Sequence, residues 1–213
     1  MEPTEDFRKY MFFTVFEKCW ISMIINTIIF LTTTVLVVDL FRQEGKWQPE
    51  KGAKAFRYFT VLSNVLCAMS ALVMAISQVS GSVSAGVVIL KYLGTVSVTV
   101  TLLTVLFFLG PTMGYKVLLS GRDLYLHLIG PLLAILSFCF LEKSGLPLWK
   151  ALLGLLPIIL YGCVYLYKVV YSPEDKRWED FYGFNKGGKW PVAFAAMMLG
   201  TLVVCLAFWA VPG

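Results

Sequence analysis

The sequence predicts an all-α, polytopic membrane protein, a six-transmembrane-helix bundle in which residues 1–213 form a single integral-membrane domain. Two observations carry this prediction. Hydrophobic residues make up 58% of the 213-residue chain and charged residues only 15%, which is unlike the composition of soluble domains. Apolar runs long enough to cross a hydrocarbon layer of ~30 Å recur along the whole length, so little remains for a soluble domain.

Six apolar segments are long enough to span a bilayer, and we expect each to form one helix. They cover residues 19–41, 56–78, 87–109, 124–141, 147–171 and 190–210. In the third segment, threonine and serine alternate with valine over residues 95–101, a pattern that favours a strand in water. A lone strand in lipid leaves its backbone groups unpaired, so we predict a helix there too.

The distribution of lysine and arginine predicts an orientation. Six spans place both termini on one side of the membrane, and that side carries six of the 18 cationic residues. The other twelve lie in or beside the connections 42–55, 110–123 and 172–189, which the positive-inside rule places in the cytoplasm. The predicted location is therefore an integral, multi-pass membrane protein. The net charge of +5 fits these juxtamembrane cations and implies no nucleic-acid partner.

His127 is the only histidine of the chain and lies about one turn inside the fourth apolar segment. An ionisable ring at membrane depth costs a few kcal/mol to hold there, which makes it a candidate functional residue. Thr60 enters the second segment from the same side of the membrane by about four residues, roughly 6 Å at the helical rise. A hydroxyl and the sole imidazole are therefore predicted to share one depth.

Small and polar residues follow the helical repeat on both segments. The second segment carries Thr60, Ser63, Asn64, Cys67 and Ala71 on one face, and the fourth carries Asp123, His127, Gly130, Ala134 and Ser137. Such faces pack against neighbouring helices in membranes, and if the two meet they bring Thr60 to His127. Pro131 lacks the N–H that would bind the carbonyl of His127, which should loosen the helix at this residue.

A hydroxyl beside an imidazole is the minimum for nucleophilic acyl transfer, because the neutral ring takes the proton as the alcohol attacks. Asp123 and Asp39 are the candidates for orienting the ring. Asn64 is a candidate oxyanion donor, and Ser63 is a rival hydroxyl.

Metal and cofactor sites are not indicated by the sequence. Five cysteines are scattered over five of the six segments without a C-x-x-C pair, and they are expected to be packing residues. No cofactor is predicted. Substrate lipid is expected to enter from the bilayer, whose lipids are the other predicted partners.

The sequence resembles the androgen-induced-gene family of intramembrane threonine hydrolases. The resemblance rests on Phe59-Thr60 after an aromatic residue, on Ser63-Asn64, and on His127 with its nearby proline. It implies hydrolysis of fatty acid esters of hydroxy fatty acids by one threonine and one histidine, without a metal. Thr60 and His127 match those two positions. Ser63-Asn64 and the segment 180–185 are more similar to a microbial branch of the family.

Two other classes of function remain open. One is a small-molecule or ion transporter, with Asp39, Asn26, Lys91, Lys168 and His127 along a path. Against it, the two lysines lie near span ends, where they are expected to snorkel to the interface. The other class is a non-catalytic scaffold with a structural His127. The connection 172–189 mixes four aromatic residues with eight charges, and it is expected to be either a lid over the site or a simple connector.

Overall fold

The computed structural model describes residues 5–43, 45–143 and 145–211, which are almost entirely helical. The elements are α1 (Glu5–Asp39), β1 (Arg42–Gln43), β2 (Lys46–Trp47), α2 (Pro49–Ala55), α3 (Phe59–Val79), α4 (Ala85–Thr104), α5 (Gly110–Met113), α6 (Tyr115–Leu118), α7 (Gly121–Leu124), α8 (Gly130–Ser137), α9 (Leu148–Ala151), α10 (Leu155–Leu166) and α11 (Trp190–Ala210). Four π-helical segments join or extend them: Val105–Leu109, Tyr125–Ile129, Phe138–Glu142 and Tyr167–Tyr171. Short 3₁₀ turns occur at Leu152–Gly154, Glu174–Lys176 and Lys186–Gly188.

Six helices of the described chain are long and apolar enough to cross a membrane, which confirms the predicted fold class. They are Glu17–Asp39, Phe59–Val79, Ala85–Met113, Gly121–Glu142, Leu148–Tyr171 and Trp190–Ala210. The segment with alternating threonine, serine and valine lies inside α4, as the argument from unpaired backbone groups predicts. The third span continues to Met113, past its predicted end at residue 109, because α5 follows the π-helical segment Val105–Leu109 without a break.

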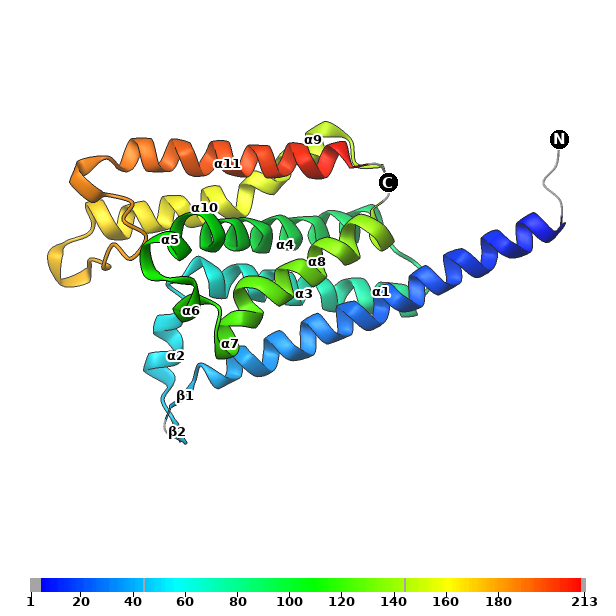
Figure 1. The fold of residues 1–213 in the computed structure, drawn as a ribbon, viewed down its shortest axis with the longest axis horizontal. Coiled ribbons are helices and arrows are strands. Elements are labelled where there is room, and N and C mark those ends of the chain that lie inside the picture. The colour runs from blue at the N-terminus through cyan, green and yellow to red at the C-terminus, as the bar shows by residue number, and fades with distance from the viewer. Residues whose placement is uncertain (1–4, 44, 144, 212–213) are drawn as a thin grey trace.

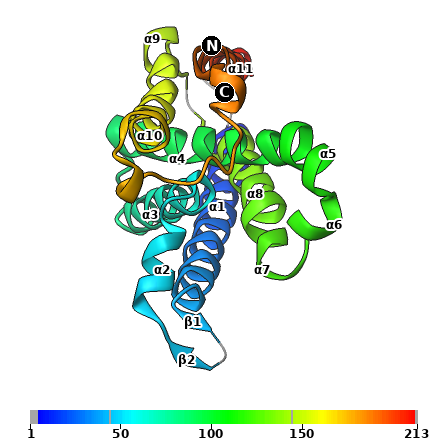
Figure 2. The same cartoon turned by 90° about the vertical axis from the view of Figure 1, so that its left-hand side faces the viewer.

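Helices α1, α3, α4 and α8 pack together, and α10 and α11 lie against α4 (Figures 1 and 2). The small-residue faces predicted on the second and fourth spans contribute to one buried cluster, in which Cys67 and Ala71 of α3 and Ala134 of α8 lie together with Ile29 and Val98. Gly94 permits the close approach of α4 to α3, since a Cβ there would lie 2.9 Å from the Cα of Cys67. A helix crossing this tight requires small side chains.

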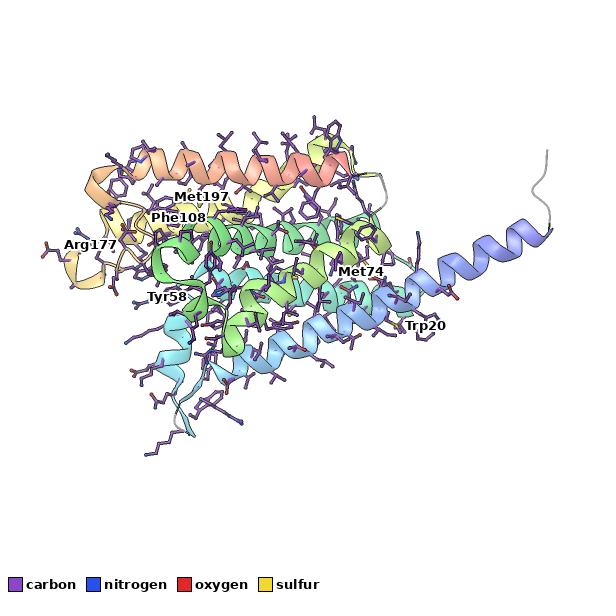
Figure 3. The ribbon with its side chains drawn as sticks, viewed as in Figure 1. Trp20, Tyr58, Met74, Phe108, Arg177 and Met197 are labelled. Carbon is purple, nitrogen blue, oxygen red and sulfur yellow. The ribbon has the colours of Figure 1, made fainter. Side chains whose placement is uncertain are left out.

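The two ends of the bundle differ. The β1–β2 hairpin, α2, α5–α7 and the connection between α10 and α11 lie at one end, which we call the basic end and define by residues 42–55, 110–123 and 172–189 (Figure 1). The C-terminus and α9 lie at the other end. Tyr58 and Arg177 mark the basic end in Figure 3, and Met74 and Trp20 lie toward the opposite one. The side of the membrane that each end faces stays a prediction.

Candidate functional site

Thr60 lies in the first turn of α3 at the basic end, half-buried. The residue before the helix, Tyr58, is extended and offers no side-chain cap, so the first N–H groups of α3 need partners from elsewhere in the fold. Ser63, the rival hydroxyl, is buried one turn further on. Its hydroxyl donates to the carbonyl of Thr60 at 3.1 Å or bonds to the hydroxyl of Thr101 at 2.8 Å. Ser63 is therefore engaged in helix packing, whereas Thr60 lines a cavity.

The cavity has a volume of about 620 Å³ and extends from Thr60 between α4, α10 and α11. Its walls are mainly aliphatic and aromatic, and none of the described lining residues is charged. Phe107 and Val203 line it and are also strongly exposed on the outside of the bundle, so it opens sideways, on a surface that lipid would cover. Phe108 and Met197, two further wall residues, lie near the basic end in Figure 3. The volume of the cavity is within the range found for ligand pockets.

His127 is buried in the π-helical segment Tyr125–Ile129. Its Nδ1 lies 2.7 Å from the carbonyl oxygen of Leu118, at the end of α6. A carbonyl oxygen only accepts, so Nδ1 carries the proton of the neutral ring and the lone pair is on Nε2. Within the described chain, no hydrogen bond links Nε2 to Thr60 or to another residue.

Asn64 connects the helix of Thr60 to the segment of His127. Its amide nitrogen donates to the carbonyl of Thr60 at 2.8 Å and to the carbonyl of Leu126 at 3.0 Å. One side chain therefore ties the nucleophile candidate to the residue that precedes the histidine. Because both amide N–H groups are used, Asn64 has no donor left for an oxyanion in this conformation.

The sequence predicts that Pro131 leaves the carbonyl of His127 without a hydrogen-bond donor. In the structure a different carbonyl lacks its donor. The N–H of Gly130 bonds to the carbonyl of Tyr125, five residues earlier, so the helix has π register here. In that register, Pro131 leaves the carbonyl of Leu126, and not that of His127, without its N–H. Asn64 supplies the missing donor.

The same arrangement recurs before Pro111. The N–H of Gly110 bonds to the carbonyl of Val105, five residues earlier, so the segment Val105–Leu109 also has π register. Pro111 then leaves the carbonyl of Leu106 without a donor, and the hydroxyl of Tyr115 donates to it at 2.8 Å.

Neither predicted carboxylate contacts the imidazole. Asp39 and Asp123 lie 3.5 Å and 4.0 Å from the guanidinium of Arg122, and both carboxylates are about half exposed. They form a surface ion-pair group at the basic end. The group that orients His127 is the Leu118 carbonyl, which a sequence pattern does not reveal.

The segment Asp180–Asn185 forms part of the cavity wall, which favours a lid over a simple connector. Tyr182, Gly183 and Phe184 line the cavity. The Asp180 carboxylate accepts hydrogen bonds from the backbone N–H groups of Phe184 and Asn185 and from the hydroxyl of Tyr165. Tyr182 is a site residue that sequence reasoning missed, because only the fold brings residue 182 to the start of α3.

A second buried polar group lies at the end of the bundle opposite the basic end. We call it the Lys91–Glu142 network, and its members are Ser22, Asn26, Gln78, Lys91, Ser137 and Glu142. The Oε1 of Glu142 accepts from Ser22, Asn26 and Ser137, and its Oε2 lies 3.9 Å from the Nζ of Lys91. Both charged side chains are fully buried. The expectation that Lys91 snorkels to the interface is therefore wrong.

The sequence contains one signal for this network. Asn26, Lys91 and Glu142 all lie near the same face of the membrane, but Glu142 falls one residue beyond the predicted fourth span, 124–141. The π-helical segment Phe138–Glu142 prolongs that span and brings the carboxylate inside. Lys168, the other lysine near a span end, is half-buried with its Nζ 6.0 Å from the ring of Tyr167.

No group of three or more histidine, cysteine or acidic side chains that could hold a metal occurs in the part of the chain that the structure describes. All five cysteines are free thiols, and Cys67 and Cys205 are buried in helix contacts. The candidate site thus consists of the Thr60 hydroxyl on the wall of an apolar cavity and the His127 imidazole, which is linked to it through Asn64 but is not among the described residues that line the cavity. No protein-family model, curated protein or solved structure matches the chain.

Proposed function

We propose that this protein is an intramembrane lipid-ester hydrolase, with Thr60 as nucleophile and His127 as general base, acting on long-chain acyl esters. The observation that carries the proposal is the position of Thr60 on the wall of an apolar cavity that opens toward the lipid-facing surface. A hydroxyl at the polar end of such a cavity meets the carbonyl of an ester whose acyl chain fills the rest.

The proposed nucleophile needs a proton acceptor, and His127 is the only imidazole in the chain. Its Nδ1–H is held by the Leu118 carbonyl, so the lone pair on Nε2 can take the proton of the threonine hydroxyl. Asn64 links the backbone of Thr60 to that of Leu126, the residue before His127. Catalytic hydrogen bonds are often long in unliganded enzymes and shorten when substrate binds, so a direct Thr60–His127 bond is expected in the complex.

The uncharged cavity wall favours the acyl chain of the substrate over its polar part. Burial of each methylene is worth about 0.8 kcal/mol, so a long chain supplies most of the binding energy. Fatty acid esters of hydroxy fatty acids, which the family resemblance implies, would place one chain in the cavity. Their carboxylate would then lie toward the cationic residues of the basic end.

Turnover of a long-chain ester by the purified protein in detergent tests the proposal. Thr60→Ala should abolish turnover, and Thr60→Ser should retain part of it, because the hydroxyl survives and only a methyl group is lost. Ser63→Ala is the matched control, and it should keep most of the activity because that hydroxyl serves helix packing. Full activity in Thr60→Ala would refute the assignment of the nucleophile.

A transporter is the second candidate function. The buried Lys91–Glu142 pair favours it, because charges inside membrane proteins often mark ion paths. The apolar cavity, however, includes none of the six network residues. Proton release from pH-loaded vesicles would separate the two functions. A transporter predicts release that Glu142→Gln abolishes, and a hydrolase predicts the same slow leak in both proteins.

A further inference from the structure

The hydroxyl group of Tyr182 covers the N-terminus of α3, next to Thr60. Its oxygen accepts a hydrogen bond from the backbone N–H of Phe59 at 3.1 Å, and it also contacts the backbone N–H and the hydroxyl of Thr60 and the hydroxyl of Tyr161. Tyr161 donates its own proton to the carbonyl of Arg57, 2.8 Å away. The Tyr182 oxygen thus accepts from the start of α3 and lies beside the hydroxyl groups of Thr60 and Tyr161.

The Tyr182 side chain is held in place from several sides. Its backbone N–H donates to the hydroxyl of Tyr165 at 3.2 Å, and that hydroxyl donates to Asp180 at 3.0 Å. The ring packs against Phe181 and Tyr165 with centroid distances of 4.6 and 5.3 Å. Gly183 adopts a positive φ of 64°, which the turn requires. The hydroxyl is therefore positioned before a substrate arrives, as electrostatic catalysis needs.

Ester hydrolysis by a threonine requires a hydrogen-bond donor for the carbonyl oxygen, which gains negative charge as the nucleophile attacks. Asn64, the candidate from the sequence, uses both amide N–H groups on backbone carbonyls. Tyr182 lines the same cavity as Thr60, and its hydroxyl accepts from the N–H of Phe59, the residue before Thr60.

We propose that Tyr182 is a catalytic residue that donates a hydrogen bond to the carbonyl oxygen of the ester as it becomes an oxyanion. This inference rests on the proposed hydrolase function. The proton of Thr60 moves to Nε2 of His127 while the threonine oxygen bonds to the carbonyl carbon and the C=O electron pair moves to oxygen. That oxyanion accepts from Tyr182. The C–O bond to the alcohol then breaks, and His127 returns the proton to the alcohol.

Water completes the cycle in the same way. Its proton moves to His127 as its oxygen bonds to the acyl carbon, the oxyanion again accepts from Tyr182, and the C–O bond to Thr60 breaks. Thr60 regains its proton from His127 and the free acid leaves. Tyr182 stabilises both oxyanions without changing its own protonation state.

The position of Tyr182 suits a donor. The N–H groups at the start of α3 carry the positive end of the helix dipole, and a hydroxyl that accepts from them is polarised to donate more strongly. Burial raises the pKa of Tyr182, although the contacts with Phe59, Tyr161 and Thr60 oppose this shift. The hydroxyl therefore keeps its proton at neutral pH.

Tyr182→Phe tests the inference, because it keeps the ring and removes only the hydroxyl. Loss of one oxyanion donor lowers kcat by about 10²–10³-fold, and we expect a loss of this order with KM almost unchanged. A long-chain trifluoromethyl ketone, which adds to the Thr60 hydroxyl to give an oxyanion, should bind Tyr182→Phe more weakly by a similar factor. An ether of the same chain length forms no oxyanion, so it should bind both proteins equally.

Tyr92→Phe is the matched control, since it removes a buried tyrosine hydroxyl that donates to the Ala151 carbonyl outside the cavity. It should leave kcat and both affinities unchanged. An undiminished kcat in Tyr182→Phe, or an equal loss of ketone and ether affinity, would overturn the role of Tyr182. Either result leaves the hydrolase proposal standing if Thr60→Ala is inactive. Activity in Thr60→Ala would instead overturn the nucleophile assignment.

Discussion

At the scale of single residues, the imidazole of His127 depends on a backbone carbonyl for its orientation. Because Nδ1 donates to Leu118, no carboxylate is needed to hold the ring or its tautomer. His127→Ala should therefore lower kcat/KM by about 10²–10⁴-fold, the usual worth of a general base. Asp123→Asn and Asp39→Asn are the controls and should keep nearly full activity. A large loss in either aspartate variant would show that a carboxylate orients the ring.

The bond between Asn64 and Leu126 gives a second prediction at the residue scale. Asn64→Ala leaves a buried carbonyl without a donor, which should lower the free energy of unfolding by about 1–3 kcal/mol. In the double variant with Pro131→Ala, residue 131 regains an N–H that can donate to Leu126 in π register. The second substitution should restore stability, as a thermal melt in detergent would show. Additive losses in the double variant would contradict this assignment of the donor.

The sequence predicts Thr60 and His127 as a pair because depth in a membrane follows directly from counting residues along a span. The partners of these residues are not predictable in this way. Leu118 and Tyr182 reach the site through connections between helices, whose paths no periodic pattern encodes. Asn64 is on the predicted face, yet its role changes because a π turn shifts the unpaired carbonyl by one residue.

At the scale of elements, α11 forms one wall of the cavity, and Gly200 is one of the α11 residues that line it. A Cβ at Gly200 meets no atom within 4 Å, so a larger side chain fits beside the cavity at this position without a clash. Gly200→Leu should sharply reduce turnover of long-chain esters and leave short-chain esters unaffected, as a chain-length series of kcat/KM would show. Gly86→Leu, in α4 outside the cavity, is the control and should not change chain-length preference.

Element boundaries are predictable only where the helix remains regular. Length and hydropathy give six spans, and five of the predicted spans end within a few residues of the structural ones. The third span is longer than predicted because α5 continues it to Met113, and Glu142 lies inside the fourth span because a π-helical segment extends to that residue. The segment 172–189 has an interfacial composition, but its contact with α3 depends on tertiary packing.

At the scale of the whole molecule, the Lys91–Glu142 network joins α1, α3, α4 and the end of the fourth span. Removing one partner of a buried ion pair leaves an uncompensated charge, which costs about 3–5 kcal/mol. Lys91→Met should therefore lower the unfolding temperature strongly, and Lys91→Met with Glu142→Gln should recover most of it. Lys150→Met, at a partly exposed lysine near Trp149, is the control. A double variant no more stable than Lys91→Met would contradict the pairing.

The positive-inside prediction concerns the orientation of the whole bundle. With the native cysteines replaced, a cysteine introduced at Gln48 should react with an impermeant maleimide only after the membrane is opened. A cysteine at Ser82, in the opposite connection, should react in intact cells. The reverse pattern would show that the twofold charge bias does not set the topology.

The central claim is that Thr60 forms a covalent acyl intermediate. Its most direct test is the intact mass of the protein after brief exposure to an activated long-chain ester, followed by fragmentation of the peptide that contains residues 58–64. We expect one acyl group on Thr60, absent from Thr60→Ala and longer-lived in His127→Ala, where it forms slowly but lacks a base for hydrolysis. An adduct on another residue, or equal labelling of Thr60→Ala, would contradict the account.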